Sequence, residues 1–133
     1  MRKILILITL LFINFSFSQG LKTSGKKIVD KKLSDLGATV VKEEKLTPYS
    51  FRYEMQFNND LMEFSKKIES IESVEILSIG KSLELIKDLG DAKTVCDRYE
   101  LDKVKGTHAI GHARMATESG VDIKSAHPFW GYP

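Results

Sequence analysis

Cysteine is nearly absent from this chain of 133 residues, and proline and histidine are scarce, with three of each. The single cysteine excludes an internal disulfide framework and any metal site built from several cysteines. Neither sign of charge dominates, because 20 lysines and arginines face 18 aspartates and glutamates, so a nucleic-acid-binding surface is not expected. Apolar residues at 42% and charged residues at 29% exclude wholesale disorder, and the length allows one domain at most.

A long apolar run is also missing, and the nearest approach to one lies at the N-terminus. Ile4–Ile13 contains nine apolar residues out of ten, follows a short basic head, and precedes Ser16 and Ser18 at the spacing that signal peptidase reads. As a helix it would span roughly 15 Å, about half of the ~30 Å hydrocarbon core, so no stable membrane span is expected. We expect residues 1–18 to be a signal-peptide-like leader, which would make the protein exported or periplasmic. A buried first strand or a short uncleaved anchor is the alternative.

The rest of the sequence alternates between helical and strand patterns. Apolar spacing up to Gly37 predicts a helix over 22–36, with its lysines as a solvent face rather than a lipid or polyanion patch. From Tyr49 to Phe57 every odd position is apolar or aromatic, which predicts a strand with one buried face rather than a base-stacking surface. Asp60 is placed to cap the next helix. The other expected elements are strands at 38–41, 74–79 and 83–86 and a helix opening at Gly90-Asp91, giving an α+β chain with mostly antiparallel strands.

Four side chains that could take part in chemistry have ordinary interpretations. Cys96 falls inside the last predicted helix, and we expect a buried, inert thiol there. His108 and His112 could share a metal ion on one helix face, but nearby glycines and β-branched residues disfavour a helix, and on a strand they would lie roughly 13 Å apart. Ser119 lacks a nucleophile elbow, so a serine hydrolase is set aside. No metal or cofactor is therefore expected.

Two blocks near the C-terminus resemble a known signature. Gly111-His112-Ala113-Arg114-Met115-Ala116-Thr117-Glu118-Ser119, followed by Ala126-His127-Pro128-Phe129, is similar to the signature of class II glutamine amidotransferases. These are the N-terminal-nucleophile (Ntn) glutaminase domains of glutamate synthases and related enzymes, and the first block looks most like the glutamate-synthase amidotransferase subunit. It departs from the family pattern at Ala113, where threonine is usual. The resemblance covers about residues 48–133, and it implies that residues 19–133 form a partial domain of this family with a partial αββα Ntn-hydrolase-like sandwich.

The resemblance also implies which residues would bind glutamine. Arg114 would grip the α-carboxylate of glutamine through two parallel charge-assisted hydrogen bonds, because the planar guanidinium matches a carboxylate. Met115, Thr117 and Glu118 would line the same pocket. The alternative for Arg114 is a surface arginine paired with Glu118. The resemblance also implies residues of structural support. His112 would pack beside Arg114, the carboxylate clamp. His127, Pro128 and Phe129 would fix the return of the loop.

The catalytic parts of this family are not found among the 133 residues. The family's nucleophile is a cysteine at the mature N-terminus whose own α-amino group acts as the base, and an Asn-Gly pair holds the oxyanion. Here the one cysteine is internal and no Asn-Gly pair occurs. We therefore expect no catalytic residue and negligible glutaminase activity from this chain alone, and we interpret it as a truncated amidotransferase domain.

The expected ligand is glutamine, and the expected partner is a synthase subunit that accepts ammonia. Such a protein would be cytoplasmic, with the leader arising from a mis-assigned start. The alternative is a small exported α+β binding protein without catalysis. The strand–helix–strand run from Tyr49 to Ile79 would suit a ferredoxin-like unit of that kind.

Overall fold

The structure, a computed structural model, describes residues 10–17 by their backbone, and also 23–113, 123, 126–129 and 131. Six elements follow one another in the order strand, helix, strand, strand, helix, strand, and two short helices come after them. These elements are β1 (Leu10–Phe17), α1 (Thr23–Asp35), β2 (Thr39–Thr47), β3 (Ser50–Gln56), α2 (Leu61–Glu69), β4 (Val74–Gly80), α3 (Ala92–Arg98) and the 3₁₀ helix η1 (Leu101–Lys103).

The four strands form one antiparallel sheet in the order β2-β3-β1-β4. With the βαββαβ element order, this is the ferredoxin-like arrangement that the Tyr49–Ile79 run suggested. Within the described ranges the strands make a single sheet, and the two-sheet Ntn-hydrolase-like sandwich stays a prediction.

Strand β1 occupies an interior position of this sheet. It pairs with β3 from Leu10 opposite Gln56 to Ser16 opposite Ser50, and with β4 on its other side. The same residues belong to the segment interpreted above as an export leader, and the alternative given there was a buried first strand. Cleavage after position 18 would take β1 out of the sheet, so the leader and this fold of the mature chain exclude each other. Export itself stays a prediction.

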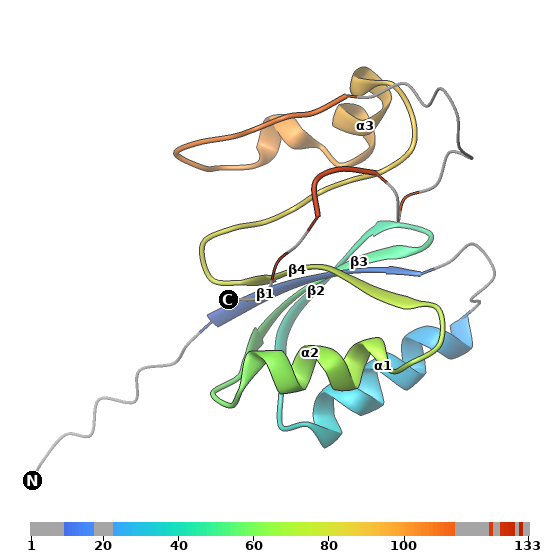
Figure 1. The fold of residues 1–133 in the computed structure, drawn as a ribbon, viewed down its shortest axis with the longest axis vertical. Helices are drawn as coiled ribbons and strands as arrows, with labels where there is room; N and C mark the ends of the chain where they lie inside the picture. The colour runs from blue at the N-terminus through green and yellow to red at the C-terminus, as the bar shows by residue number, and fades with distance from the viewer. Residues whose placement is uncertain (1–9, 18–22, 114–122, 124–125, 130, 132–133) are drawn as a thin grey trace, which may run out of the picture.

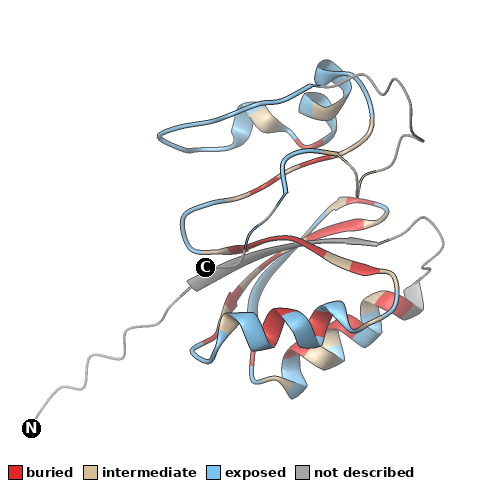
Figure 2. Cartoon of the chain, viewed as in Figure 1, coloured by how far each residue is buried: buried red, intermediate tan, exposed pale blue. Residues whose placement is uncertain are grey.

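Helices α1 and α2 cover one face of the sheet, and the core lies between them and the strands (Figure 1; Figure 2). The strict alternation predicted for β3 is confirmed, because its odd-numbered residues are buried and its even-numbered ones from Arg52 on are half-buried. Phe57, just beyond the strand, packs against Phe64 of α2 with 4.4 Å between ring centroids. The best-buried apolar side chains, all at most 2% exposed, are Val29, Leu33, Tyr53, Met55, Phe64, Ile68 and Ile79.

The predicted helix ends and the lysine face are largely confirmed. Gly37 follows α1 with a φ of +84°, a left-handed conformation that suits glycine, and the side chain of Asp60 accepts a hydrogen bond from the Glu63 N–H to cap α2. Lys27 and Lys31 are exposed as expected. Lys26 differs, because it is half-buried, pairs with Asp30 and lies 5.7 Å from the Phe51 ring centroid. Its stem therefore contributes to packing.

Two predictions about the second half of the chain are wrong. Leu83–Ile86 forms no strand, because the Leu85 N–H donates to the side chain of Ser78 rather than to a neighbouring strand, and the segment leaves the edge of the sheet. Cys96 is exposed, not buried. None of the seven residues of α3 is buried, and Tyr99 directly after the helix, 6% exposed, packs instead.

Candidate functional site

The residues that follow β4 lie on the face of the sheet opposite α1 and α2. Figure 1 shows segment 81–91, α3 and the described C-terminal residues together on this side. Leu85 and Lys87 of the segment are both 8% exposed, so it is held against the sheet rather than extended into solvent. The second signature block contacts this segment through Lys87, which meets Ala126 and Phe129.

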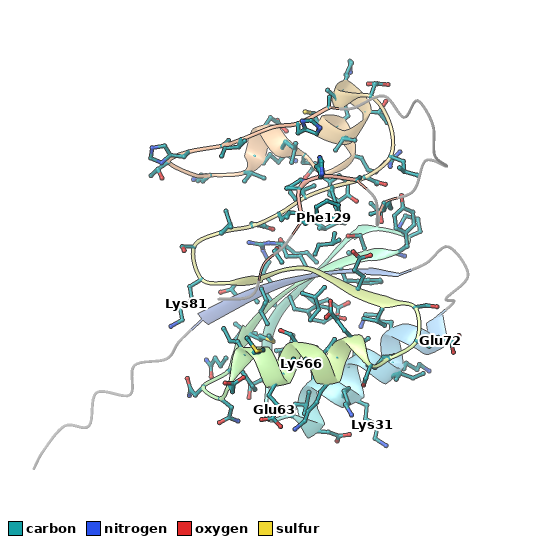
Figure 3. All side chains as sticks on the ribbon, viewed as in Figure 1. Lys31, Glu63, Lys66, Glu72, Lys81 and Phe129 are labelled. Carbon is teal, nitrogen blue, oxygen red and sulfur yellow. The ribbon has the colours of Figure 1, made fainter. Side chains whose placement is uncertain are left out.

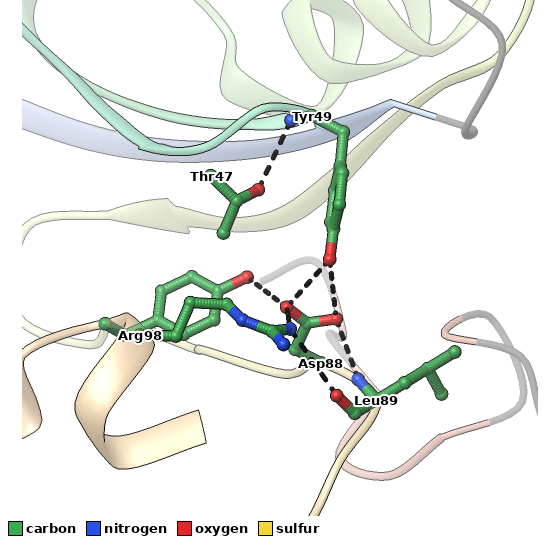
Figure 4. Close-up of polar contacts among 6 residues, drawn as sticks. Thr47, Tyr49, Asp88, Leu89 and Arg98 are labelled. Carbon is green, nitrogen blue, oxygen red and sulfur yellow. Dashed lines mark hydrogen bonds and ion pairs between the residues drawn. The ribbon is translucent and has the colours of Figure 1, made fainter. Parts of the chain in front are cut away.

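Asp88 is the polar centre of this region (Figure 4). Its carboxylate is 1% exposed and accepts hydrogen bonds from the Tyr49 hydroxyl at 3.1 and 3.2 Å, the Tyr99 hydroxyl at 3.0 Å and Arg98 Nη1 at 2.6 Å. The backbone N–H of Leu89 donates to it as well, at 2.7 Å. One side chain therefore connects the β2–β3 turn, segment 81–91 and the end of α3.

These donors also decide the charge state of Asp88. Burial by itself raises the pKa of a carboxyl, but the hydrogen bonds from Arg98, the Leu89 N–H, Tyr99 and Tyr49 together outweigh it and hold the pKa of Asp88 below its ordinary value. The two tyrosines respond in the opposite direction, because burial and the nearby carboxylate raise the pKa of Tyr49 and of Tyr99. Asp88 is thus an anion whose partners stay protonated.

Lys87 points to a different set of partners from those of its neighbour Asp88. Its side chain is 6% exposed, and its Nζ lies 3.6 Å from Glu75 Oε1 of β4 and 3.4 Å from the carbonyl oxygen of Ala126, to which it donates. The same nitrogen lies 5.4 Å from the centroid of the Phe129 ring, within the range of a cation–π contact. Figure 3 shows Phe129 on the side of the sheet away from the two helices.

Three of the predicted support residues form a cluster of rings. The His112 and His127 ring centroids are 5.5 Å apart, and those of His127 and Phe129 are 4.9 Å apart in an edge-to-face arrangement. Pro128 lies between His127 and Phe129 in the sequence, and the His127–Pro128 peptide bond is cis. All four residues are exposed. The two sequence blocks therefore meet in space, while the role of these residues as support for a substrate site stays a prediction.

The predicted substrate-binding residues lie outside the described part of the chain. These residues are Arg114, Met115, Thr117 and Glu118, and Ser119 lies outside it as well. His108 is exposed, and its Nδ1 lies 3.0 Å from Thr107 Oγ1. Across the described residues no group of three or more histidine, cysteine, aspartate or glutamate side chains is arranged to hold a metal ion.

The sequence reasoning missed Lys87 and Asp88. The apolar residues before them predicted only a short strand at 83–86, and neither charged residue belongs to a recognised motif. The sequence does place a lysine and an aspartate directly between Ile86 and Leu89. If such a segment is buried, both charged side chains need partners, and this pattern could have indicated their role.

Comparison with curated proteins finds two relatives by sequence. The chain is 43% identical over 84 residues to a protein of Methanothermobacter thermautotrophicus named "Putative glutamine amidotransferase", a match that covers 63% of this chain. It is 46% identical over 56 residues, or 42% of the chain, to the glutamine amidotransferase-like protein GlxB of Rhizobium meliloti. This chain is related to proteins named glutamine amidotransferases. The matches cover 28% and 19% of those relatives' own lengths, so the chain corresponds to a minor part of each.

Other comparisons add little to this relationship. No protein-family profile matches the chain. Among solved structures, the P2 domain of the chemotaxis kinase CheA from Thermotoga maritima, determined in complex with CheY, is similar with a TM-score of 0.46 and 18% identity, over 52% of this chain and 95% of that one. Within the described residues no helix has the length and apolar character needed to cross a bilayer.

Proposed function

We propose that this chain carries the substrate-binding part of a class II glutamine amidotransferase domain, in which glutamine is held for amide hydrolysis and the ammonia passes to a synthase. The observation that carries the proposal is the meeting of the two signature blocks. His112 and His127 are separated by 14 intervening residues, and their rings are nevertheless in contact at 5.5 Å. The relationship to proteins named glutamine amidotransferases supports the same function.

The chemistry of the first block suits an amino-acid substrate. Free glutamine carries an α-carboxylate, and Arg114, two positions after His112, can meet it with two parallel N–H···O bonds. Met115 supplies an adaptable apolar wall, and Thr117 and Glu118 supply a hydroxyl and a carboxylate to the same pocket. An arginine cannot lose its charge at physiological pH, so the clamp is always available to an anion.

Hydrolysis needs a nucleophile that these residues do not supply. By resemblance, the reaction begins when an N-terminal cysteine thiolate attacks the glutamine amide carbon, ammonia leaves, and water then hydrolyses the thioester. Cys96 is the one cysteine of the chain, and it lies inside α3 with its nitrogen in a peptide bond. We infer that the 133-residue chain binds glutamine without turning it over.

The test is a measurement of glutamine affinity by titration calorimetry on the full chain. Arg114→Ala removes charge-assisted hydrogen bonds worth roughly 1.5–3 kcal/mol, so the Kd for glutamine should rise by about 10- to 100-fold. Glutamine α-amide, which lacks the carboxylate, should bind the unaltered chain weakly and should bind the variant no worse. Lys105→Ala, a loss of one exposed cation outside the signature, is the matched control and should leave the Kd unchanged.

The ferredoxin-like sheet favours a second candidate function, a small α+β binding protein without catalysis. The observation behind it is the complete βαββαβ order with β1 inside the sheet. A fold of this kind hosts many functions and by itself names no ligand. A stable chain whose calorimetric trace shows no heat with glutamine, before and after Arg114→Ala, would favour this second candidate.

A further inference from the structure

We propose that Lys87 is a positioning residue for the glutamine site, which fixes the second signature block on the sheet and, through it, the arginine clamp. This inference rests on the proposed function and deepens it. Lys87 belongs to neither signature block. Its effect would pass through Phe129 and His127 to His112, which lies two residues before Arg114.

The ammonium group of Lys87 is buried, and burying such a group is costly. A lysine head has three N–H donors and no acceptor, and taking it out of water is unfavourable unless those donors find partners. Lys87, 6% exposed in its side chain, has three partners within the described residues, and they come from two places. Glu75 belongs to the sheet, while the Ala126 carbonyl and the Phe129 ring belong to the second block.

This division couples the burial of Lys87 to the docking of the second block. If residues 126–129 moved away, the ammonium would keep one carboxylate at 3.6 Å and lose both of its other partners. Conversely, the block has little apolar burial to hold it, because Phe129 is 61% exposed and His127 and Pro128 are exposed as well. Among the described contacts, those of Lys87 with Ala126 and Phe129 are therefore the main attachment of this block to the sheet.

Docking of the block then orders the ring cluster. Phe129 lies edge-to-face against His127, and His127 contacts His112 of the first block. Fixing one member of such a chain of rings restricts the others, so the backbone that leads into Arg114 is held before substrate arrives. Preordering of this kind lowers the entropic cost of binding and so increases affinity without adding a contact to the ligand.

Lys87→Met tests the proposal, because methionine keeps the apolar stem and removes the ammonium. Two quantities are measured on the full chain: the NMR resonances of the His112 and His127 rings, which report ring geometry, and the Kd for glutamine. We expect both sets of ring resonances to move toward the values of free histidine and the Kd to rise roughly tenfold. Lys87→Arg, which restores the charge and the donors, should recover most of the affinity and of the resonance positions.

Two controls separate positioning from stability. Ile68→Val shortens a fully buried side chain of α2 and lowers stability on the other face of the sheet, and Lys93→Met removes an exposed lysine from α3. Both should leave the ring resonances and the Kd unchanged. If Lys87→Met does not fold, Glu75→Gln, which removes only the carboxylate partner, should move the same resonances in the same direction by a smaller amount.

The outcomes distinguish this proposal from the proposed function. Wild-type resonances and affinity in Lys87→Met would overturn the positioning role while leaving glutamine binding intact. If the unaltered chain binds no glutamine, the proposed function fails. The ring resonances then still show whether Lys87 holds residues 126–129 on the sheet. A shift of the ring resonances in Lys87→Met but not in Ile68→Val would support this role of Lys87, and no shift in either variant would overturn it.

Discussion

At the scale of single residues, Asp88 connects several segments on the face of the sheet opposite α1 and α2, so its loss should weaken the contacts of all of them. Asp88→Asn keeps the shape of the side chain but removes the negative charge to which Arg98 and two tyrosine hydroxyls donate hydrogen bonds. A hydrogen bond to a charged group contributes about 1.5–3 kcal/mol, so we expect the free energy of unfolding at neutral pH to fall by about 2 kcal/mol. Urea unfolding followed by circular dichroism measures this change.

The pH dependence of the same variant has a definite sign. Because the pKa of Asp88 is lower in the folded chain, the unfolded chain binds the proton more tightly, and the stabilisation is lost as pH falls through the folded pKa. The gap in unfolding free energy between the unaltered chain and Asp88→Asn should be full above about pH 5 and should close in stronger acid. Asp97→Asn, an exposed partner of Lys93, is the control and should change stability by less than about 0.5 kcal/mol. A gap that stays constant down to pH 2 would refute the assignment.

Residue-scale prediction from sequence succeeded where a pattern is local and failed where the partners are distant. The Asp60 cap could be predicted because its acceptor and the Glu63 N–H are three residues apart. The contacts of Asp88 with Tyr49 and of Lys87 with Ala126 each span 39 residues. No periodicity encodes such pairs, and they become visible once the sheet has brought the segments together.

At the scale of elements, β1 decides whether the sheet exists. It is hydrogen-bonded to β3 on one side and β4 on the other, and those two strands are not neighbours of each other. A chain of residues 19–133 would therefore leave the sheet open along its middle. We expect that chain to lose cooperative thermal unfolding, which circular dichroism monitors, while a chain of residues 10–133 keeps it.

The outcome also bears on the leader. If residues 19–133 unfold cooperatively at the midpoint of the full chain, β1 is dispensable and cleavage by signal peptidase is compatible with a folded product. If they do not, an exported and cleaved form could not retain this sheet. Sequence composition alone could not decide, because alternating strands and leader segments are both short apolar runs, and pairing with distant strands is what separates them.

Prediction of the other elements depended on whether one face of the element is buried. The alternation of β3 and the helix expected after Asp60 were correct because each element packs one face on a core. Leu83–Ile86 has the composition of a strand, but Leu85 N–H is already bonded to Ser78 Oγ, and the segment crosses the sheet face instead of extending it. For α3, helical spacing was right and burial was wrong, because the helix packs mainly through Tyr99 beyond its end.

At the scale of the whole molecule, the chain combines a sheet with one helix-covered face and a signature-bearing segment docked on the other (Figure 1). Lys87 and Asp88, adjacent in segment 81–91, have different partners. Lys87 contacts Glu75 and the second signature block, and Asp88 contacts Tyr49 and Arg98. The rings of His112 and His127, one from each signature block, lie 5.5 Å apart, and their role as support for a substrate site stays a prediction. The ferredoxin-like order of the sheet was indicated by the strand–helix–strand run from Tyr49 to Ile79 and not by those blocks.

The proposed function separates the binding of glutamine from its hydrolysis. If the proposed function holds, a chain of these 133 residues should bind glutamine but release no ammonia from it above the uncatalysed background. The proposed reaction uses a thiolate activated by its own α-amino group, and the one thiol, Cys96, sits inside α3. An enzyme-coupled ammonia assay over several hours measures this, with Cys96→Ser as the matched control, which should behave identically. Ammonia release that disappears in Arg114→Ala would contradict the prediction, and release that disappears in Cys96→Ser would identify an unexpected nucleophile. Binding without release would mean that these residues can hold glutamine without the sulfur that the proposed reaction needs.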